Sequence, residues 1–159
     1  MTGHGTHASK PTQPPVAVLA DSDPAARGML AALLEECGYH VCAHAARVQA
    51  EDALAQHGGL ATTLVIDLEL VTDIEELIDL RRRFSHCRIV VSGRSGDAET
   101  ADLVTALNLD DGDWMILDKP YDLMEISRQL TVPASTLKTR PASSAPASGP
   151  NQSARNSAR

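Results

Sequence analysis

The chain repeats one unit five times, a short run of apolar residues followed by a segment with helical periodicity. The apolar runs cover residues 16–20, 64–66, 89–91 and 115–117, and an alternating segment at residues 40–44 takes the second place. Strands and helices that alternate at this length predict a parallel sheet with right-handed crossovers and helices on both faces. This repeat constrains the fold to an α/β domain built on one parallel sheet.

The segments between the apolar runs carry helix signals. Asp23 can cap a helix, Pro24 suits its first position, and Gly38 ends it. Residues 40–44 alternate polar and apolar, which suits an edge strand. The predicted helices cover residues 24–37, 47–57, 74–84, 98–107 and 123–130.

Composition divides the chain into three parts. Residues 16–131 form one domain, long enough to bury a core. Residues 1–15 have no apolar period and predict a disordered N-terminal arm. Residues 132–159 are rich in Ala, Ser and Pro, carry four basic residues and no acid, and predict a disordered basic tail.

The charge of the predicted domain is strongly negative. Residues 16–131 hold all 21 acidic residues and nine of the 14 basic ones, so their net charge is −12. This balance argues against nucleic-acid binding by the folded domain. Four dispersed cations in the tail are typical of a solvated segment.

The cysteines and the hydropathy pattern bear on the cellular compartment. Cys37, Cys42 and Cys87 are odd in number and lack metal-ligand spacing, which favours reduced thiols in a cytosol. No apolar run approaches 18 residues and no signal peptide opens the chain. We therefore expect a cytoplasmic protein without a membrane segment.

Polar residues follow four of the predicted strands. Asp21 follows the first strand, Asp67 the third, Ser92 the fourth and Lys119 the fifth. In a parallel sheet these strand ends lie at one edge, where ligands bind. Each residue alone is also compatible with a solvated turn or a strand end, so the prediction of a site depends on the four together.

The residue types at this edge suit phosphoryl transfer. Asp67 would be the nucleophile, while Asp21 and its neighbours would hold Mg²⁺, which prefers a few carboxylates plus water. The Lys119 ammonium and the Ser92 hydroxyl would contact phosphoryl oxygens. The cation would relieve the repulsion between the crowded carboxylates.

In these motifs the chain resembles the receiver domain of two-component response regulators, over residues 16–130. The resemblance implies a flavodoxin-like, doubly wound five-stranded sheet of order 2-1-3-4-5, in a single-domain regulator. It is carried by Val18-Leu19-Ala20-Asp21-Ser22-Asp23-Pro24, Leu64-Val65-Ile66-Asp67-Leu68, Val90-Val91-Ser92-Gly93 and Asp118-Lys119-Pro120-Tyr121.

The resemblance also implies roles for single residues. Asp67 would accept a phosphoryl group from the phosphohistidine of a sensor histidine kinase or phosphotransfer protein. Ser92 and Ile116 occupy the two switch positions, and Lys119 precedes a peptide bond that is usually cis. The Glu69 backbone carbonyl would join Asp21 and Asp67 as an Mg²⁺ ligand. Arg94 and the Glu69 side chain occupy positions that modulate dephosphorylation.

Output and catalysis follow from the same resemblance. The protein is expected to be a phosphoacceptor, with self-dephosphorylation as its own chemistry, and not an enzyme acting on a separate substrate. A downstream protein would bind the face formed by residues 98–107, 115–117 and 123–130. The same face leaves homodimerisation open.

Three positions depart from the family pattern and motivate an alternative. Ser22 stands where a second acid normally ligates Mg²⁺, Val71 replaces a usual proline, and Ile116 replaces the usual aromatic switch residue. A neutral hydroxyl is the poorer ligand. The alternative is a pseudo-receiver, an interaction module that works without phosphorylation.

A flavodoxin-like cofactor enzyme is a third interpretation, because the same fold can host flavins and nucleotides. The loop at residues 21–24 lacks the glycine-rich phosphate cradle that such a site would need. The sequence therefore favours the receiver interpretation.

Overall fold

The computed structural model describes residues 13–94, 96–110 and 114–131. Its five strands are all parallel and form one sheet in the order β2-β1-β3-β4-β5, which confirms the predicted flavodoxin-like topology. β2 lies at an edge, as its alternating pattern predicts. The strands are β1 (Val16–Ala20), β2 (His40–His44), β3 (Ala61–Asp67), β4 (Arg88–Gly93) and β5 (Met115–Asp118).

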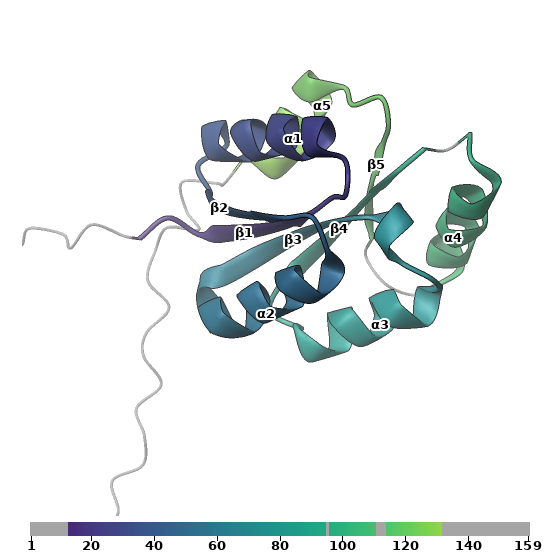
Figure 1. The fold of residues 1–159 in the computed structure, drawn as a ribbon, viewed down its shortest axis with the longest axis horizontal. Coiled ribbons are helices and arrows are strands. Elements are labelled where there is room, and N and C mark those ends of the chain that lie inside the picture. The colour runs from purple at the N-terminus through teal and green to yellow at the C-terminus, as the bar shows by residue number, and fades with distance from the viewer. Residues whose placement is uncertain (1–12, 95, 111–113, 132–159) are drawn as a thin grey trace, which may run out of the picture.

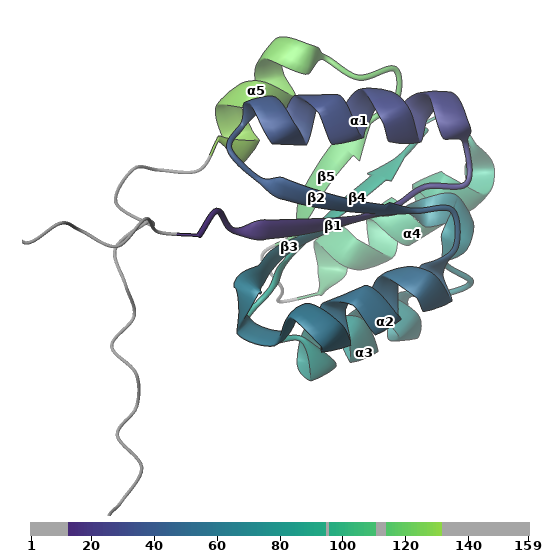
Figure 2. The same cartoon turned by 60° about the vertical axis from the view of Figure 1, so that its left-hand side comes forward.

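Five α-helices cover the two faces of the sheet in the described part of the chain. Figures 1 and 2 show α1 and α5 together on one face, with α2 and α3 on the other. α4 contributes Leu107 to the same core cluster as α2 and α3. The helices are α1 (Pro24–Glu36), α2 (Arg47–His57), α3 (Ile74–Arg83), α4 (Ala98–Leu109) and α5 (Leu123–Leu130), with short 3₁₀ turns at Gly58–Leu60 and Leu68–Leu70.

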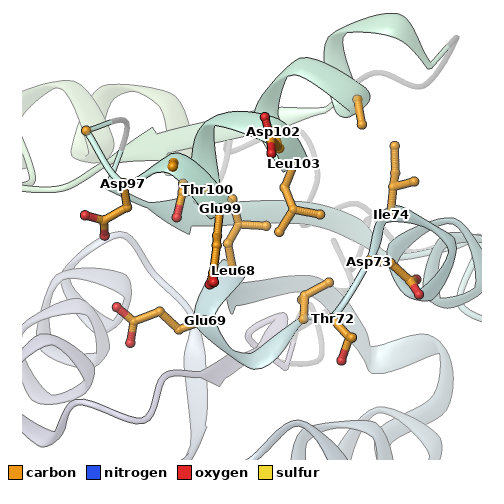
Figure 3. Close-up of a pocket in the computed structure, with 14 residues that line it drawn as sticks. Leu68, Glu69, Thr72, Asp73, Ile74, Asp97, Glu99, Thr100, Asp102 and Leu103 are labelled. Carbon is orange, nitrogen blue, oxygen red and sulfur yellow. The ribbon is translucent and has the colours of Figure 1, made fainter.

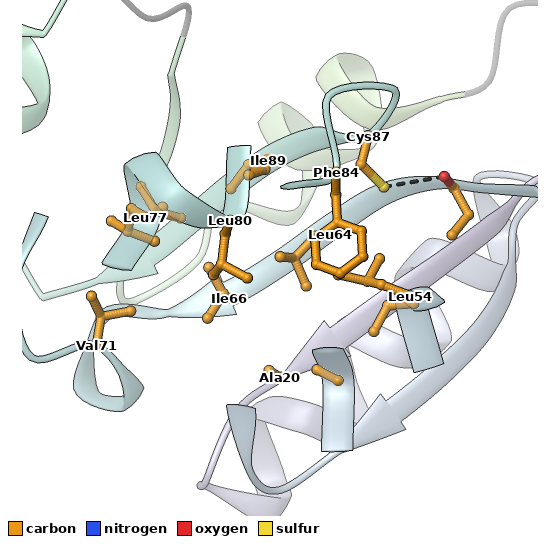
Figure 4. Packing of buried hydrophobic residues seen from close by; sticks show 14 of the residues in the cluster. Ala20, Leu54, Leu64, Ile66, Val71, Leu77, Leu80, Phe84, Cys87 and Ile89 are labelled. Atoms are coloured by element: carbon orange, nitrogen blue, oxygen red, sulfur yellow. Dashed lines mark hydrogen bonds between the residues drawn. The ribbon is translucent and has the colours of Figure 1, made fainter. Parts of the chain in front are cut away.

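The larger core cluster lies between the sheet and the helices α2, α3 and α4. Figure 4 shows Phe84 packed beside Leu54 of α2 and Leu64 of β3. The Cys87 thiol in this cluster donates a hydrogen bond to the Ala61 carbonyl at 3.1 Å. Each large aliphatic side chain buried in this way stabilises the fold by about 1.5–3 kcal/mol.

The central strand β3 explains the apolar run of the sequence. Leu64 and Ile66 belong to the cluster facing α2 and α3, whereas Val65 belongs to a second cluster with Leu34 of α1 and Ile126 of α5. Successive side chains of a strand point to opposite faces, so a strand covered on both sides is apolar throughout. The strand's last residue, the carboxylic acid Asp67, is buried as well.

The helix ends follow the predicted signals. The Asp23 carboxylate accepts a hydrogen bond from the Ala25 amide, and Pro24 opens α1. Gly38 has a φ of 100°, a left-handed conformation that glycine adopts without a steric penalty. Within α2, Val48 is exposed, whereas Ala50 and Leu54 are buried.

Some expectations lie beyond what the structure describes. The predicted tail, residues 132–159, and most of the predicted arm, at residues 1–12, fall outside the described residues. The proposed domain boundaries therefore stay predictions. No helix within the described residues is long and apolar enough to cross a membrane.

Candidate functional site

The predicted site residues meet at the carboxyl edge of the sheet. Ala20 pairs with Ile66, so Asp21, directly after β1, lies level with Asp67, the last residue of the neighbouring strand β3. Asp67 pairs with Ser92 of β4, and the Lys119 amide donates to the Gly93 carbonyl at 2.9 Å. The sheet therefore brings together residues that are up to 98 positions apart in sequence.

Lys119 joins the two carboxylates. Its Nζ atom lies 2.6 Å from Asp67 Oδ2 and 3.3 Å from Asp21 Oδ2. Both aspartate side chains have no exposed surface, while the lysine side chain retains 12%. Because buried charges are costly unless they are paired, this ammonium is what makes two buried carboxylates tolerable.

The other oxygen of each carboxylate is held by the backbone. Asp21 Oδ1 accepts from the Asp23 amide at 2.9 Å, and Asp67 Oδ1 accepts from the Glu69 amide at 3.2 Å. Each acceptor lies two residues before its donor, a local turn that orients the carboxylate without a distant partner. Both carboxylates are thus aimed before any ligand arrives.

The surroundings of the site shift the pKa values of Asp21 and Lys119. Burial raises the pKa of the Asp21 carboxyl above its ordinary value, and the negative charge of Asp67 acts in the same direction. Burial alone would lower the pKa of the Lys119 ammonium, but its hydrogen bond to Asp67 and the surrounding negative charge raise it overall. The site therefore holds one firmly protonated cation and more negative charge than that cation balances.

Ser92 and Gly93 complete the edge next to Asp67. Ser92 is buried, and its Oγ atom makes no hydrogen bond. A Cβ atom added at Gly93 would lie 2.7 Å from Thr100 Cγ2 and 3.1 Å from Leu68 Cδ1. Only glycine lets α4 and the turn after β3 approach this strand end so closely.

The donor set is compatible with Mg²⁺, although it is small. Mg²⁺ takes one or two protein carboxylates and completes its shell with water and substrate phosphate. Asp21 and Asp67 supply two carboxylates, and the pKa of Asp21 is raised by its burial and by the charge of Asp67. Among the described residues no group of three His, Cys, Asp or Glu side chains is arranged to hold a metal ion.

Ser22 and Asp23 do not enlarge this donor set. Ser22 is exposed, and Asp23 is exposed and uses its carboxylate to cap α1. Asp23 therefore does not replace the acid that is missing at Ser22. Their physical role is local, because both belong to the turn that starts α1.

Arg27 is a neighbour of the site that sequence reasoning missed. Its Nη1 atom donates to the Asp21 carbonyl at 2.6 Å and lies 3.4 Å from the Ser22 carbonyl. This guanidinium fixes the backbone that carries Asp21. The signal was a basic residue one turn into a helix whose cap follows the first strand, where a cation opposes the helix dipole.

The remaining predicted residues lie around the site. Glu69 and Arg94 are exposed, and Ile116 is half-buried against the larger core cluster. Trp114 is held away from the strand end, because its Nε1 atom donates to Asp110 at 2.8 Å and Arg81 stacks over its ring at 4.8 Å. Trp114 therefore does not stand in for the aromatic residue absent at Ile116.

A pocket of about 1050 Å³ opens beside the site, between the turn after β3 and α4. Figure 3 shows Glu69 on one side of this pocket and Asp97 and Glu99 on the other. Leu68 and Leu103 supply apolar lining, and the carboxylates give the opening a negative charge. This field disfavours polyanionic ligands such as nucleic acid.

Comparison with known proteins gives matches at the level of structure. Neither a protein-family model nor a curated protein sequence matches the chain. The signal receiver domain of an HD-domain-containing protein from Pseudomonas fluorescens matches with a TM-score of 0.60 and 18% identity. That alignment covers 75% of this chain and 94% of the other.

Two further solved structures have the same fold. Chemotaxis protein CheY4 from Vibrio cholerae matches with a TM-score of 0.57 and 15% identity, over 74% of this chain and 97% of the other. A putative pilus assembly protein from Burkholderia thailandensis matches with a TM-score of 0.55 and 19% identity, over 73% and 94%. The chain therefore has the receiver-domain fold of two-component response regulators.

Proposed function

We propose that the protein is a response-regulator receiver in which Asp67 accepts a phosphoryl group. The observation that carries this proposal is the contact of Lys119 with two fully buried carboxylates, Asp67 at 2.6 Å and Asp21 at 3.3 Å. The receiver-domain fold supports the same function. A purely structural ion pair would need one carboxylate for one ammonium, and this site holds two.

The reaction transfers the phosphoryl group to a carboxylate oxygen of Asp67. That oxygen forms a bond to phosphorus, and the bond from phosphorus to the donor histidine nitrogen breaks. The imidazole keeps the electron pair of the broken bond. Lys119 pairs with the charge on a phosphoryl oxygen, and the Ser92 hydroxyl donates to another. The donor is a sensor histidine kinase or a phosphotransfer protein.

The groups that would hold Mg²⁺ are the carboxylates of Asp21 and Asp67 and the backbone carbonyl of Glu69. Ser22 stands at the position of the missing acid but is exposed. Bound Mg²⁺ would screen the negative charge of the incoming phosphoryl oxygens. The chain's own residues bury the two carboxylates at the ends of β1 and β3 and orient them through the Asp23 and Glu69 amides.

Signalling would follow from a shift between two conformations of the domain. A phosphoryl group at Asp67 gives Ser92 a hydrogen-bond acceptor that it lacks in the free protein, and so favours conformations in which Ser92 turns toward it. Ile116, next along the sheet, is the second switch position. The face of α4, β5 and α5 would then bind a downstream protein, or a second copy of the chain, in the cytoplasm.

The protein is proposed as a phosphoacceptor and not as an enzyme with a separate substrate. Hydrolysis of its own phosphoryl group would end the signal. Glu69 and Arg94 flank Asp67 and Ser92 in the sequence and are exposed, so they can influence how water reaches the phosphorus.

The test is the intact mass of the protein after incubation with a small acyl phosphate, with and without Mg²⁺. We expect a phosphoryl adduct in the wild type that requires the metal and is absent from Asp67→Asn. The control is Asp102→Asn, since Asp102 is an exposed carboxylate of α4. An equal adduct in wild type and Asp67→Asn would refute the assignment.

A second candidate function is a pseudo-receiver, favoured by one observation. The described residues offer two carboxylates and an exposed Ser22 where a magnesium site of three acids is the usual pattern. In that case the folded wild type would form no adduct at any Mg²⁺ concentration. It would bind its partner equally well with and without the phosphodonor.

A further inference from the structure

Two buried hydroxyl groups beside the site have no hydrogen-bond partner. They are Ser92 Oγ and Tyr121 Oη. A buried hydroxyl without a partner costs folding free energy and is uncommon in proteins. Two of them beside one lysine and two aspartates therefore require a physical explanation.

Tyr121 reaches the site from the segment between β5 and α5. It follows Lys119 and Pro120, and Lys119 Nζ lies 5.9 Å from the centroid of its ring. The ring packs against the core cluster that contains Val65 and Val90. Ser92 lies two residues after Val90 and so points to the same face of the sheet as Tyr121.

The hydroxyl group of Ser92 needs a hydrogen-bond donor for its lone pairs when its own proton is used. It carries one proton to donate and two lone pairs that accept. In the phosphorylated site that proton goes to a phosphoryl oxygen, which leaves the lone pairs of Oγ without a donor. Lys119 is already engaged by Asp67 and Asp21. The phenol of Tyr121 is a neighbouring donor without a partner.

We propose that Tyr121 is a positioning residue that donates a hydrogen bond to Ser92 Oγ when Ser92 donates to the phosphoryl group on Asp67. This inference rests on the proposed function. It assigns to Tyr121 a role that a phenylalanine could not fill, since the ring alone would pack equally well. In the free protein the hydroxyl groups of Ser92 and Tyr121 lack hydrogen-bond partners, and in the phosphorylated protein both have one. This difference favours the phosphorylated state.

The protonation state of Tyr121 suits a donor. Burial raises the pKa of the phenol above its ordinary value, and the neighbouring Ser92 hydroxyl and Lys119 ammonium offset part of that increase. The phenol therefore keeps its proton at neutral pH. The Tyr121 hydroxyl therefore donates a hydrogen bond to Ser92 Oγ, and the Ser92 hydroxyl donates one to the phosphoryl oxygen.

The test is a double-mutant cycle on the yield of phosphoryl adduct, using the full chain and a small acyl phosphate with Mg²⁺. We expect Tyr121→Phe to lower the steady-state ratio of phosphorylated to free protein by about five-fold, the effect of one hydrogen bond. In the Ser92→Ala background the same change should have no further effect. Thermal unfolding of each variant confirms that it is folded.

Tyr39→Phe is the matched control. The Tyr39 hydroxyl also sits in a half-buried site, where it accepts a hydrogen bond from Thr63 at 3.4 Å, away from the carboxylates. Tyr39→Phe should leave the ratio of phosphorylated to free protein unchanged. An effect of Tyr121→Phe that is equal in both backgrounds would show a merely structural role and overturn the inference.

The two proposals fail in different ways. If the wild type forms no adduct, the proposed function fails and the role of Tyr121 falls with it. If the wild type forms an adduct and Tyr121→Phe forms as much, the function stands and only the role of Tyr121 is overturned.

Discussion

Lys119 Nζ lies 2.6 Å from Asp67 Oδ2, and the same ammonium reaches a second buried carboxylate, that of Asp21, at 3.3 Å. One partly exposed positive charge thus compensates two buried carboxylates. The free domain carries an unbalanced negative charge at its candidate site. Its stability and its ligand binding should both depend on that imbalance.

Removing the ammonium should destabilise the fold. Lys119→Met leaves Asp21 and Asp67 buried without a cation, and we expect the free energy of unfolding at pH 7 to fall by about 3 kcal/mol. Denaturant unfolding measures this change. Arg128→Met is the control, because Arg128 pairs with Glu125 at the surface and should contribute about 0–1 kcal/mol. Equal small effects would contradict the account.

Neutralising Asp21 should have the opposite effect. Burial raises the pKa of this carboxyl, so the folded protein binds its proton more tightly than the unfolded chain does. The contribution of Asp21 to stability is therefore fully present below the ordinary pKa of 3.8 and is lost as the pH rises through the raised value.

This pH dependence gives a prediction for Asp21→Asn in metal-free buffer. We expect the variant to exceed the wild type by about 1 kcal/mol in unfolding free energy at pH 7. The difference should vanish at pH 3.5, where the wild-type carboxyl is protonated. Unfolding curves at the two pH values measure it, and a variant less stable than wild type at pH 7 would contradict the sign.

The topology of the site could be predicted from the sequence because it depends on strand ends. Asp67, Ser92 and Lys119 each follow an apolar run, and the edge of a parallel sheet brings such ends together. The resemblance carried by these motifs implies the strand order that the structure has. The roles of these residues remain predictions.

Other features could not be predicted because they depend on how side chains orient across long sequence separations. The two contacts of Lys119 join residues that are 52 and 98 positions apart. The Arg27 contact with the Asp21 carbonyl depends on a single arginine rotamer. The unpartnered Tyr121 hydroxyl can be recognised only once burial is known.

Gly93 should not tolerate a side chain. Gly93→Ala places a Cβ atom 2.7 Å from Thr100 Cγ2, and we expect a loss of about 1–3 kcal/mol in unfolding free energy. Adding Thr100→Ser removes that methyl group and should recover much of the loss. Gly28→Ala is the control, because nothing lies within 4 Å of its Cβ position in α1.

The control variant Gly28→Ala is itself expected to change the stability of the protein. Gly28 lies inside a helix, where alanine is more favourable than glycine by about 0.5–1 kcal/mol. Gly28→Ala should therefore stabilise the protein. A Gly93→Ala variant as stable as wild type would mean that α4 and the turn after β3 are not held as closely as the structure places them.

Magnesium should stabilise the wild type through the two carboxylates. At a Mg²⁺ concentration ten times the dissociation constant we expect a gain of about 1.4 kcal/mol in unfolding free energy. The gain should disappear in Asp21→Asn and persist in Asp102→Asn, which removes an exposed carboxylate beside the pocket. Thermal unfolding with Mg²⁺ and with a chelator measures it. Equal gains in all three proteins would indicate nonspecific binding.

The most direct test of the central claim locates the phosphoryl group on the chain. The wild type is incubated with a small acyl phosphate and Mg²⁺, the acyl adduct is reduced with borohydride, and the modified residue is identified by tandem mass spectrometry. We predict modification of Asp67 alone, the carboxylate held by Lys119 at 2.6 Å. Modification of Asp21 or Ser92 in its place, or no modification of the folded protein, would contradict the account.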